Sequence, residues 1–517
     1  MLGLALLFLL PASAEAEWRE KRDICTSGER CFGDEVGCIP CVYGFAPYSP
    51  EEIGMLFYVY SSNAKESQFH WAGRQQGVAS LTINPAKNLW VIIHGFEGQW
   101  PLEWLDLLRK RLVTAGNTVL IARWSDGTAY PHNYPQAAVN GLVVGNLTAI
   151  IINAIHEKHG LDMDRVNLLG FSMGVHVAGH VGAALGGKAK QLTIPVVGLD
   201  PPEKLYEGRP IEQRLDPSDA QMVQVIHTHG ASLLKGGLGT LIPMGDVDFY
   251  VNGGEEQPGC PITERDELSI TRFYDVIKLV GCNHLRCPAL FLDSVLNNRC
   301  SYTAFACPSE ADWSRGQCFA CHPHEGCLQM GYHLNTSTVQ RGSFYLNTLV
   351  DQGINEPDLA YCGTQYRLTL YPDAEVKGII DVTIMDEIYM SQPQRFQDRD
   401  NTLYLTSRSN IVTASTRRPT QLKIFYNRQN YGIFRSAFSF NLTRAVLLSL
   451  DGTAFEFRGS ALVRDDFSTI LALQPTRLNV ADFLAQTART SAASLLTSPA
   501  FAIPILFSVL LAPMIAS

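Results

Sequence analysis

The sequence has little positive charge, and this shortage excludes one large class of partners. Its 41 Lys and Arg residues are outnumbered by 50 Asp and Glu residues, which gives a net charge of −9. Because nucleic-acid binding depends on Lys and Arg that neutralise phosphates, we expect no nucleic acid among the partners. The remaining composition, 46% hydrophobic and 18% charged, is that of an ordinary globular protein, and 517 residues allow two or three domains.

A long apolar run is missing at the amino terminus, where a first membrane-spanning helix could lie. Residues 2–10 are apolar, which is too short to cross a bilayer, and small residues up to Ala16 offer cleavage sites. The positive charge that usually precedes such a run is limited to the α-amino group. This pattern predicts a secretory signal peptide over residues 1–16.

Basic residues are also absent after the apolar carboxy terminus. Residues 500–516 are uncharged and contain Pro504 and Pro513, and no Lys or Arg follows them. These features disfavour a spanning helix, which needs a longer run and a basic flank. Small residues shortly before the run make the tail over 476–517 similar to a GPI-anchor signal. We therefore expect a secreted protein that is held at the cell surface by a glycolipid, and the alternative is a freely secreted enzyme with a disordered or poorly folded tail.

The thirteen cysteines lack the clustering of a zinc site. Cys38-x-x-Cys41 and Cys318-x-x-Cys321 have metal-ligand spacing, but the two pairs lie far apart in the sequence. An exported chain uses this many cysteines in disulfide bonds. Since thirteen is odd, at least one cysteine stays unpaired.

Residues 165–177, RVNLLGFSMGVHV, contain the motif on which the prediction of function depends. An apolar run is followed by Gly170-Phe171-Ser172-Met173-Gly174 and then by a small-residue helical stretch. Between a strand and a helix, Gly-x-Ser-x-Gly is the nucleophile elbow, which lifts a serine above the edge of a sheet. We predict Ser172 as a nucleophile. For the motif alone, the alternative is a glycine-rich turn.

A serine nucleophile needs a base, and a carboxylate that orients the base. Asp200 ends the next apolar strand, 194–199, and so opens onto the same edge of a parallel sheet, although it could also be an ordinary turn Asp. The base is expected on a later loop, where His284 fits. His227 and His229 are rivals, but they lie in a strand-like run and look more like core or strand-end histidines.

An oxyanion hole needs two backbone N–H donors. Met173, the residue after the nucleophile, supplies one. The other is expected from the loop that follows the apolar strand 89–93, where Phe96 lies.

These motifs resemble the pancreatic lipase family of secreted triglyceride lipases and phospholipases. The resemblance is close from Cys25 to about residue 350 and looser to about residue 475, and it depends on five segments in the family's order: VIIHGF, LLGFSMG, GLDPPE, RLDPSDA and GCNHLR. It implies Ser172, Asp200 and His284 as nucleophile, acid and base, and Phe96 and Met173 as oxyanion-hole donors.

The resemblance also implies a set of disulfides: Cys25–Cys31, Cys260–Cys282, Cys307–Cys318 and Cys321–Cys327. We expect Cys287–Cys300 as an additional pair because it brackets an apolar helical stretch. Cys38, Cys41 and Cys362 are left without assigned partners.

A structural calcium ion is implied by the resemblance at RLDPSDA. Asp216 and Asp219 would provide side-chain oxygens, and Ile211 and Arg214 would provide carbonyl oxygens, the hard ligands that calcium prefers. Family members often carry Glu at the position of Ile211, a change that a carbonyl ligand tolerates. Without the resemblance, these residues are better interpreted as a solvated acidic turn.

Strands alternate with helical stretches from residue 54 to residue 200, which predicts a mostly parallel sheet with crossover helices. We predict an α/β-hydrolase catalytic domain over 17–350 and a linker over 351–362. Beyond the linker, QYRLTLY, KGIIDVTIM and QLKIFYN alternate apolar and polar residues. This period of two predicts antiparallel strands, and the region 363–475 resembles the family's carboxy-terminal β-sandwich of the PLAT type.

An amphipathic helix is predicted between Cys260 and Cys282. The apolar residues that recur at helical spacing are Ile270, Phe273, Ile277 and Val280. A helix of this kind just before the base is what an interface-sensitive lid needs, and the alternative is a surface helix packed on the core.

Three Asn-x-Ser/Thr sequons, at Asn146, Asn335 and Asn441, are candidate glycosylation sites. Asn146 lies in a predicted helix and is the weakest of the three.

Taken together, these features predict a secreted or cell-surface serine hydrolase. It would cleave carboxylic esters of triglycerides or related acylglycerolipids through an acyl-enzyme, with structural Ca²⁺ and no organic cofactor. The partners implied by the resemblance are a lipid substrate at an oil–water or membrane interface and a colipase-like protein. Two alternatives stay open: a phospholipase or galactolipase, and a non-catalytic relative that binds lipid or protein.

Overall fold

The computed structural model describes the chain from residue 28 to residue 477, with gaps. The described ranges are 28–42, 44–62, 64–96, 102–128, 134–186, 195–202, 205–231, 237–260, 273–296, 300–321, 326–335, 340–349, 361–373, 378–386, 390–391, 394–396, 408–414, 418–428 and 439–477. The predicted signal peptide, most of the linker and the GPI-type tail beyond residue 477 lie outside them.

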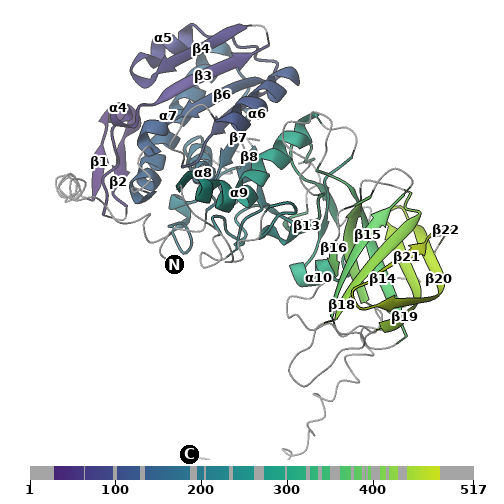
Figure 1. Cartoon of the computed structure of the whole chain (residues 1–517). Coiled ribbons are helices and arrows are strands. Elements are labelled where there is room, and N and C mark those ends of the chain that lie inside the picture. The colour runs from purple at the N-terminus through teal and green to yellow at the C-terminus, as the bar shows by residue number, and fades with distance from the viewer. Residues whose placement is uncertain are drawn as a thin grey trace, which may run out of the picture. The chain divides into compact units, whose positions relative to one another are not determined.

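The chain divides into two compact units (Figure 1). The first comprises residues up to 313, 318–364 and 413–415, and the second comprises 314–317, 365–412 and the residues from 416 onward.

The first unit contains an eleven-stranded sheet in the order β12-β11-β13-β10-β9-β8-β7-β5-β6-β3-β4. The seven strands from β13 to β6 are parallel to one another, and the two strands beyond each end of this block pair antiparallel. The strands are β3 Leu56–Ser61, β4 Ala64–His70, β5 Leu89–Ile93, β6 Thr118–Arg123, β7 Val166–Phe171, β8 Pro195–Leu199, β9 Met222–His227, β10 Val247–Val251, β11 Thr303–Ala306, β12 Cys327–Gln329 and β13 Gly342–Leu346.

Helices cover both faces of this sheet, as a buried parallel sheet requires. Side chains alternate along β5: Val91 and Ile93 pack with α7 Tyr134–His159 and α8 Gly174–Ala184, whereas Trp90 and Ile92 pack with α6 Glu103–Thr114 and α9 Phe273–Leu296. Shorter elements complete the unit: β1 Glu29–Cys31, α3 Gly33–Val36, β2 Cys38–Pro40, α4 Pro50–Ile53, α5 Arg74–Ala79 and α10 Glu310–Ser314. This arrangement confirms the predicted α/β-hydrolase fold.

Among the described residues, α7 is the one helix long and apolar enough to cross a membrane. Its most apolar window is 72% buried inside the protein, however, and its side chains belong to the core between the helices and the sheet. Composition alone therefore does not make α7 a membrane span, because a core helix has the same composition.

The described residues contain five complete disulfides. Cys260–Cys282, Cys307–Cys318 and Cys321–Cys327 confirm three of the predicted pairs. Two predicted pairs are wrong. Cys31 bonds to Cys38 instead of Cys25, because the hairpin of β1 and β2 places these two residues opposite each other.

The predicted pair Cys287–Cys300 is the second error. Cys300 bonds to Cys362, at the end of the linker, and Cys287 is a buried free thiol. The Cys287 side chain faces the core from α9 and its thiol donates to the carbonyl of Ile226 at 3.4 Å. Cys41 is also disulfide-bonded.

The second unit consists of two antiparallel sheets, as predicted. One has the order β17-β14-β19-β20-β22 and the other β16-β15-β18-β21. Their strands are β14 Thr364–Pro372, β15 Gly378–Met385, β16 Gln394–Phe396, β17 Arg408–Ala414, β18 Gln421–Arg428, β19 Ser439–Ser449, β20 Thr453–Arg464, β21 Ser468–Ala472 and β22 Gln474–Arg477. Along β18, Leu422, Ile424 and Tyr426 are fully buried, which matches the period-two pattern in the sequence.

The three sequons lie in different surroundings. The Asn146 amide, on α7, donates to the Val36 carbonyl at 3.5 Å, and Thr148 of the same sequon is fully buried. A glycan needs an exposed acceptor, so this environment disfavours glycosylation at Asn146. Asn335 is exposed, and Asn441 on β19 is partly buried and donates to Asp373.

Candidate active site

Ser172 occupies a sharp turn between β7 and α8, with φ at 54°, in the left-handed region. The glycines on either side allow the turn to form. A Cβ atom on Gly170 would lie 2.2 Å from the carbonyl oxygen of Gly174, and one on Gly174 would lie 2.3 Å from that of Ile93. The Ser172 N–H donates to the Leu199 carbonyl at 2.9 Å, which fixes the turn against the neighbouring strand. The serine is therefore held at the carboxyl edge of the sheet in a strained conformation.

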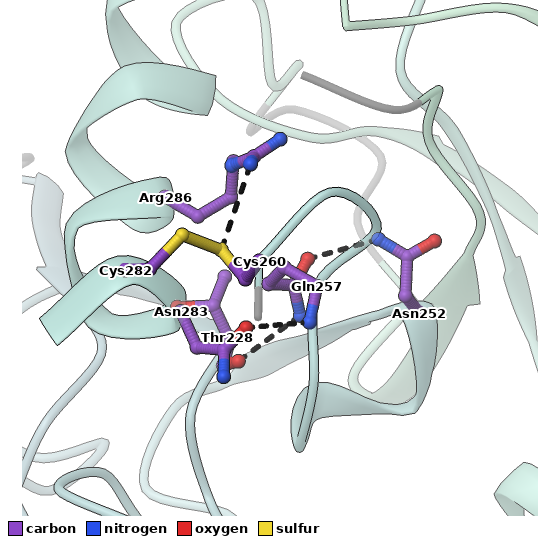
Figure 2. Close-up of a disulfide and its surroundings, with 7 residues drawn as sticks. All are labelled: Thr228, Asn252, Gln257, Cys260, Cys282, Asn283 and Arg286. Atoms are coloured by element: carbon purple, nitrogen blue, oxygen red, sulfur yellow. Dashed lines mark hydrogen bonds between the residues drawn. A yellow bond between two sulfur atoms is a disulfide. The ribbon is translucent and has the colours of Figure 1, made fainter. Parts of the chain in front are cut away.

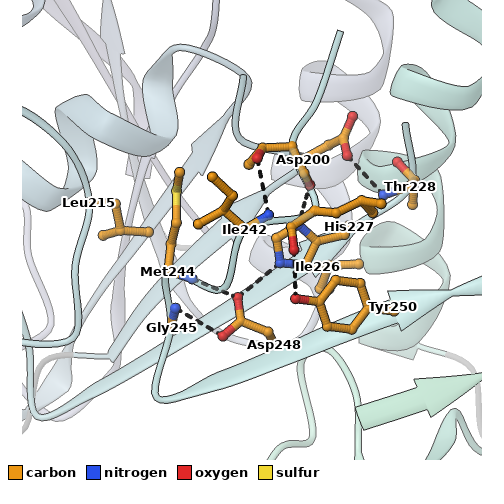
Figure 3. A network of polar contacts seen from close by, with 12 residues as sticks. Asp200, Leu215, Ile226, His227, Thr228, Ile242, Met244, Gly245, Asp248 and Tyr250 are labelled. Atoms are coloured by element: carbon orange, nitrogen blue, oxygen red, sulfur yellow. Dashed lines mark hydrogen bonds and ion pairs between the residues drawn. The ribbon is translucent and has the colours of Figure 1, made fainter. Parts of the chain in front are cut away.

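Asp200 follows β8 at the same edge and is fully buried. Its Oδ1 accepts the backbone N–H groups of Thr228 at 2.8 Å (Figure 3) and His229 at 3.0 Å, and its Oδ2 accepts Nδ1–H of His284 at 2.5 Å. Burial by itself raises the pKa of Asp200. The hydrogen bond and charge of His284 and the Thr228 N–H more than offset burial, so the pKa is lowered overall. The carboxylate is thus kept ionised beside His284.

His284 lies inside α9, not on a loop, which corrects our expectation. Cys287, Leu290 and Phe291 repeat at helical spacing and are fully buried, so their packing extends the helix through His284. Pro288, four residues later, has no N–H to donate to the His284 carbonyl, so the helical hydrogen bond is missing at this residue. The centroid of the His284 ring lies 4.7 Å from that of the Phe171 ring. Phe171 is the residue directly before the elbow serine.

Two neighbouring contacts fix the position of His284 on α9 (Figure 2). Cys282 is bonded to Cys260, and the Asn283 side-chain oxygen accepts the N–H of Gln257 at 2.7 Å. The Gln257 amide in turn donates to the carbonyls of Thr228 and Val251. The segment that supports Asp200 is therefore tied to the helix that carries His284.

The lid prediction concerns Ile270, which is outside the described residues, and the first eight residues of α9, whose side chains are not described.

His227 has a structural environment. Its Nδ1 faces the Thr240 carbonyl at 2.7 Å and its Nε2 faces Oδ1 of Asp248 at 2.9 Å (Figure 3). The ring is fully buried and stacks on Tyr250. With both nitrogens engaged, His227 presents no lone pair to a substrate and is a poor candidate for the base.

His229 lies next to the acid and the candidate base. Its ring centroid is 6.3 Å from that of His284, and its Nδ1 is buried without a hydrogen-bond partner among the described residues. Burial lowers the pKa of His229 to about 4, so the ring is neutral at physiological pH. The sequence pattern predicted a core histidine here and did not indicate the proximity to His284.

The loop after β5 lies directly against the elbow. A Cβ atom on Gly95 would be 2.6 Å from Cβ of Ser172, so only glycine fits at this position. His94 is fully buried, and its Nε2 accepts the backbone N–H of Trp124. Its Nδ1 therefore carries the proton and donates to the Gly95 carbonyl at 2.9 Å. Burial lowers the pKa of His94 to about 4, which keeps this neutral form.

This contact orients one of the predicted oxyanion donors. In a trans peptide the C=O and N–H groups point in opposite directions, so fixing the Gly95 carbonyl also fixes the N–H of Phe96. Met173, the other predicted donor, is fully buried at the start of α8, next to Ser172. His94 thus fixes the peptide that carries the predicted donor Phe96, and the sequence analysis missed this residue although it stands in the VIIHGF segment.

The predicted calcium residues form a turn that packs on α8. Asp219 Oδ2 accepts the N–H of Asp216 at 3.0 Å, and Asp216 Oδ1 accepts that of Ser218 at 2.8 Å. A Cβ atom on Gly182 of α8 would lie 2.3 Å from the carbonyl oxygen of Asp219, so the turn and the helix are in close contact. Both carboxylates are buried, at 7% and 6% exposure.

Ile211 and Arg214 lie beside the acidic turn, in and after a short helical turn over Ile211–Gln213. The Ile211 side chain is a hydrocarbon without a donor atom, so only the backbone carbonyl of this residue can contribute a ligand. The Arg214 guanidinium donates to the carbonyls of Arg209 and Leu215. The donor set of two buried carboxylates and nearby carbonyls fits a hard cation such as Ca²⁺.

The fold and this site define an α/β hydrolase with a serine at a nucleophile elbow and an Asp–His pair beside it. A sequence model of the Lipase family matches residues 23–352, and the chain belongs to this family.

The similar proteins include some that are named as lipases and some that are named inactive. The chain is 33% identical over 357 residues to the inactive pancreatic lipase-related protein 1 of Mus musculus, covering 66% of this chain and 72% of that protein. It is 32% identical over 346 residues to the Homo sapiens pancreatic lipase-related protein 2, covering 63% and 71%. It is 31% identical over 341 residues to the Equus caballus pancreatic triacylglycerol lipase, covering 63% and 71%.

Proposed function

We propose that this protein hydrolyses carboxylic ester bonds of triglycerides or related acylglycerolipids through an acyl-enzyme. The observation that carries the proposal is the 2.5 Å hydrogen bond between His284 and the buried Asp200, with the His284 ring packed on Phe171 next to Ser172. A base oriented by a buried carboxylate beside an elbow serine is the arrangement that acyl transfer needs.

In the proposed mechanism, Ser172 attacks the ester carbonyl while His284 Nε2 accepts its proton. Asp200 holds the His284 proton on Nδ1, which leaves the Nε2 lone pair available, and it stabilises the imidazolium that forms. The N–H groups of Phe96 and Met173 donate to the oxyanion, and His94 fixes the peptide that supplies the first of them. His284 then protonates the departing alcohol. In the second half of the reaction a water molecule attacks the acyl-enzyme, His284 accepts the proton of this water and returns it to Ser172, and the fatty acid leaves.

The competing proposal is a non-catalytic relative that binds lipid or protein. Its motivation is that several similar proteins are named inactive. The presence of Ser172, Asp200 and His284, and the contact between the last two, favours an enzyme.

Two assays of the purified protein test the proposal. Release of fatty acid from emulsified triglyceride and from phospholipid vesicles would establish hydrolysis and distinguish a triglyceride lipase from a phospholipase. A third substrate, a water-soluble short-chain ester, separates chemistry from interfacial binding. Absence of turnover on all three, in a protein that is folded by circular dichroism, would favour the non-catalytic alternative.

A calcium ion at Asp216 and Asp219 is proposed as a structural element of this enzyme. Because the turn packs on α8, which begins at the last residue of the elbow, the ion would stabilise the position of Ser172. Chelation with EGTA is expected to lower the melting temperature, and added Ca²⁺ to restore it. The same melting temperature in EGTA and in excess Ca²⁺ would contradict the proposal.

We propose further that the mature enzyme is exported and anchored to the outer cell surface by a glycolipid. The basis is the sequence pattern at both ends, an apolar leader and an apolar tail without a basic flank. When expressed in animal cells, the protein is expected to be released from the surface by a phosphatidylinositol-specific phospholipase. Recovery of soluble enzyme that still ends at Ser517 would rule the anchor out.

A further inference from the structure

The imidazole of His229 has no role in the proposed hydrolysis. The backbone N–H of His229 supports Asp200, but any residue other than proline could provide that N–H. The ring itself is buried, at 4% exposure of the residue, and its Nδ1 has no hydrogen-bond partner among the described residues. Leaving a buried polar atom unpaired destabilises a fold, so such atoms often bind a ligand or an ion.

The surroundings of this ring have the composition of a metal site. Asp200, His229 and His284 each offer one ligand atom, and the three atoms all lie within 4.8 Å of one another. All three residues are buried. Two imidazoles and one carboxylate form a donor set that suits zinc and related divalent transition metals, whereas calcium and magnesium prefer oxygen ligands.

The distances require a small adjustment. Tetrahedral zinc, with bonds of about 2.0–2.2 Å, places its ligand atoms about 3.3 Å apart. The His284–Asp200 contact of 2.5 Å would therefore widen by about 0.8 Å, and a separation at the upper limit of 4.8 Å would shorten by about 1.5 Å. Changes of this size are within reach of side-chain rotation.

We propose that Asp200, His229 and His284 form an inhibitory binding site for a divalent transition metal such as Zn²⁺. The metal forms one bond to an Asp200 oxygen, one to His229 and one to His284 Nδ1, and a water molecule completes the coordination. The proton on His284 Nδ1 moves to Nε2 through solvent, so the ring stays neutral. With Nε2 protonated, His284 has no lone pair to accept the Ser172 proton, and hydrolysis stops.

Binding can be tested without any measurement of hydrolysis. Co²⁺ added to the purified full-length protein is expected to produce visible absorption typical of a four- or five-coordinate site, saturating at one equivalent, and Zn²⁺ is expected to abolish it. Ser172→Ala should bind Co²⁺ as the wild type does, because Ser172 is not a ligand. Absence of this absorption in the wild type would overturn the proposal, whatever the outcome for hydrolysis.

Inhibition rests on the proposed function and is measured separately, with a soluble short-chain ester. Zn²⁺ is expected to inhibit the wild type reversibly, with recovery in EDTA. In His229→Gln and His229→Asn, the concentration for half-inhibition should rise at least tenfold. His333→Gln, which removes an exposed histidine elsewhere, should behave as the wild type. Unchanged inhibition in folded His229 variants would place the zinc site elsewhere and refute this assignment.

Discussion

Replacement of Ser172 by alanine is expected to lower kcat for ester hydrolysis by about 10⁶-fold, the scale of a lost triad nucleophile. In the proposed mechanism no other group forms the acyl-enzyme, because His284 and Asp200 act through the serine. The backbone of the elbow should be unchanged. The Ser172 N–H still donates to Leu199, and alanine has the same Cβ as serine in the left-handed turn.

The measurement is a progress curve on a soluble ester, together with labelling by a fluorophosphonate that reacts with activated serines. Wild-type protein should be labelled once and inactivated, and Ser172→Ala should not be labelled. Ser301→Ala, at an exposed serine, is the matched control and should retain full activity and labelling. Near-wild-type turnover in folded Ser172→Ala protein would refute the proposed mechanism.

Replacement of Asp200 by asparagine is expected to lower kcat by about 10⁴-fold. The structure determines how the new amide is oriented. The N–H groups of Thr228 and His229 both point at Oδ1, so the amide oxygen takes that position and the NH₂ group faces His284 Nδ1. His284 then accepts at Nδ1 and carries its proton on Nε2, where the base needs a lone pair.

Stability should change with the same substitution. The pKa of Asp200 is lowered in the folded protein, so its carboxylate stabilises the fold above the ordinary value of 3.8, and this contribution is lost as the pH falls through the lowered pKa. Asp200→Asn lacks the contribution at neutral pH and should melt at a lower temperature. The control is Asp126→Asn, at a mostly exposed carboxylate, which should keep its kcat. An Asp200→Asn enzyme with wild-type kcat would mean that Asp200 does not orient the base.

The fold and part of the site could be predicted because they depend on local rules. Alternating strands and helices specify a parallel sheet, and in such a sheet the residues that end β7 and β8 must meet at one edge. The approach of Asp200 to the segment before Ser172 therefore follows from the sequence pattern. The Thr228 and His229 N–H groups that bind Asp200 lie directly after a third strand, β9. The sequence pattern does not specify the register of β9 against β8.

The environment of His284 could not be predicted in the same way. Gly281 precedes it and Pro288 follows it, and both residues locally favour a break in a helix. The helix continues because Cys287, Leu290 and Phe291 are buried against the sheet, a tertiary effect that outweighs local preference. The same burial leaves the Cys287 thiol in the core, where it donates to the Ile226 carbonyl, while Cys300 is bonded to Cys362.

The pairing of Cys300 with Cys362 spans 62 residues and depends on the tertiary fold. It has a consequence for proteolysis. A protease that cut the backbone once between residues 350 and 360 would produce two polypeptides still joined by this bond, and they would separate only after reduction. In oxidising surroundings, a nicked molecule would thus keep its β-sheet unit, and the cut would appear as two fragments only on a reducing gel.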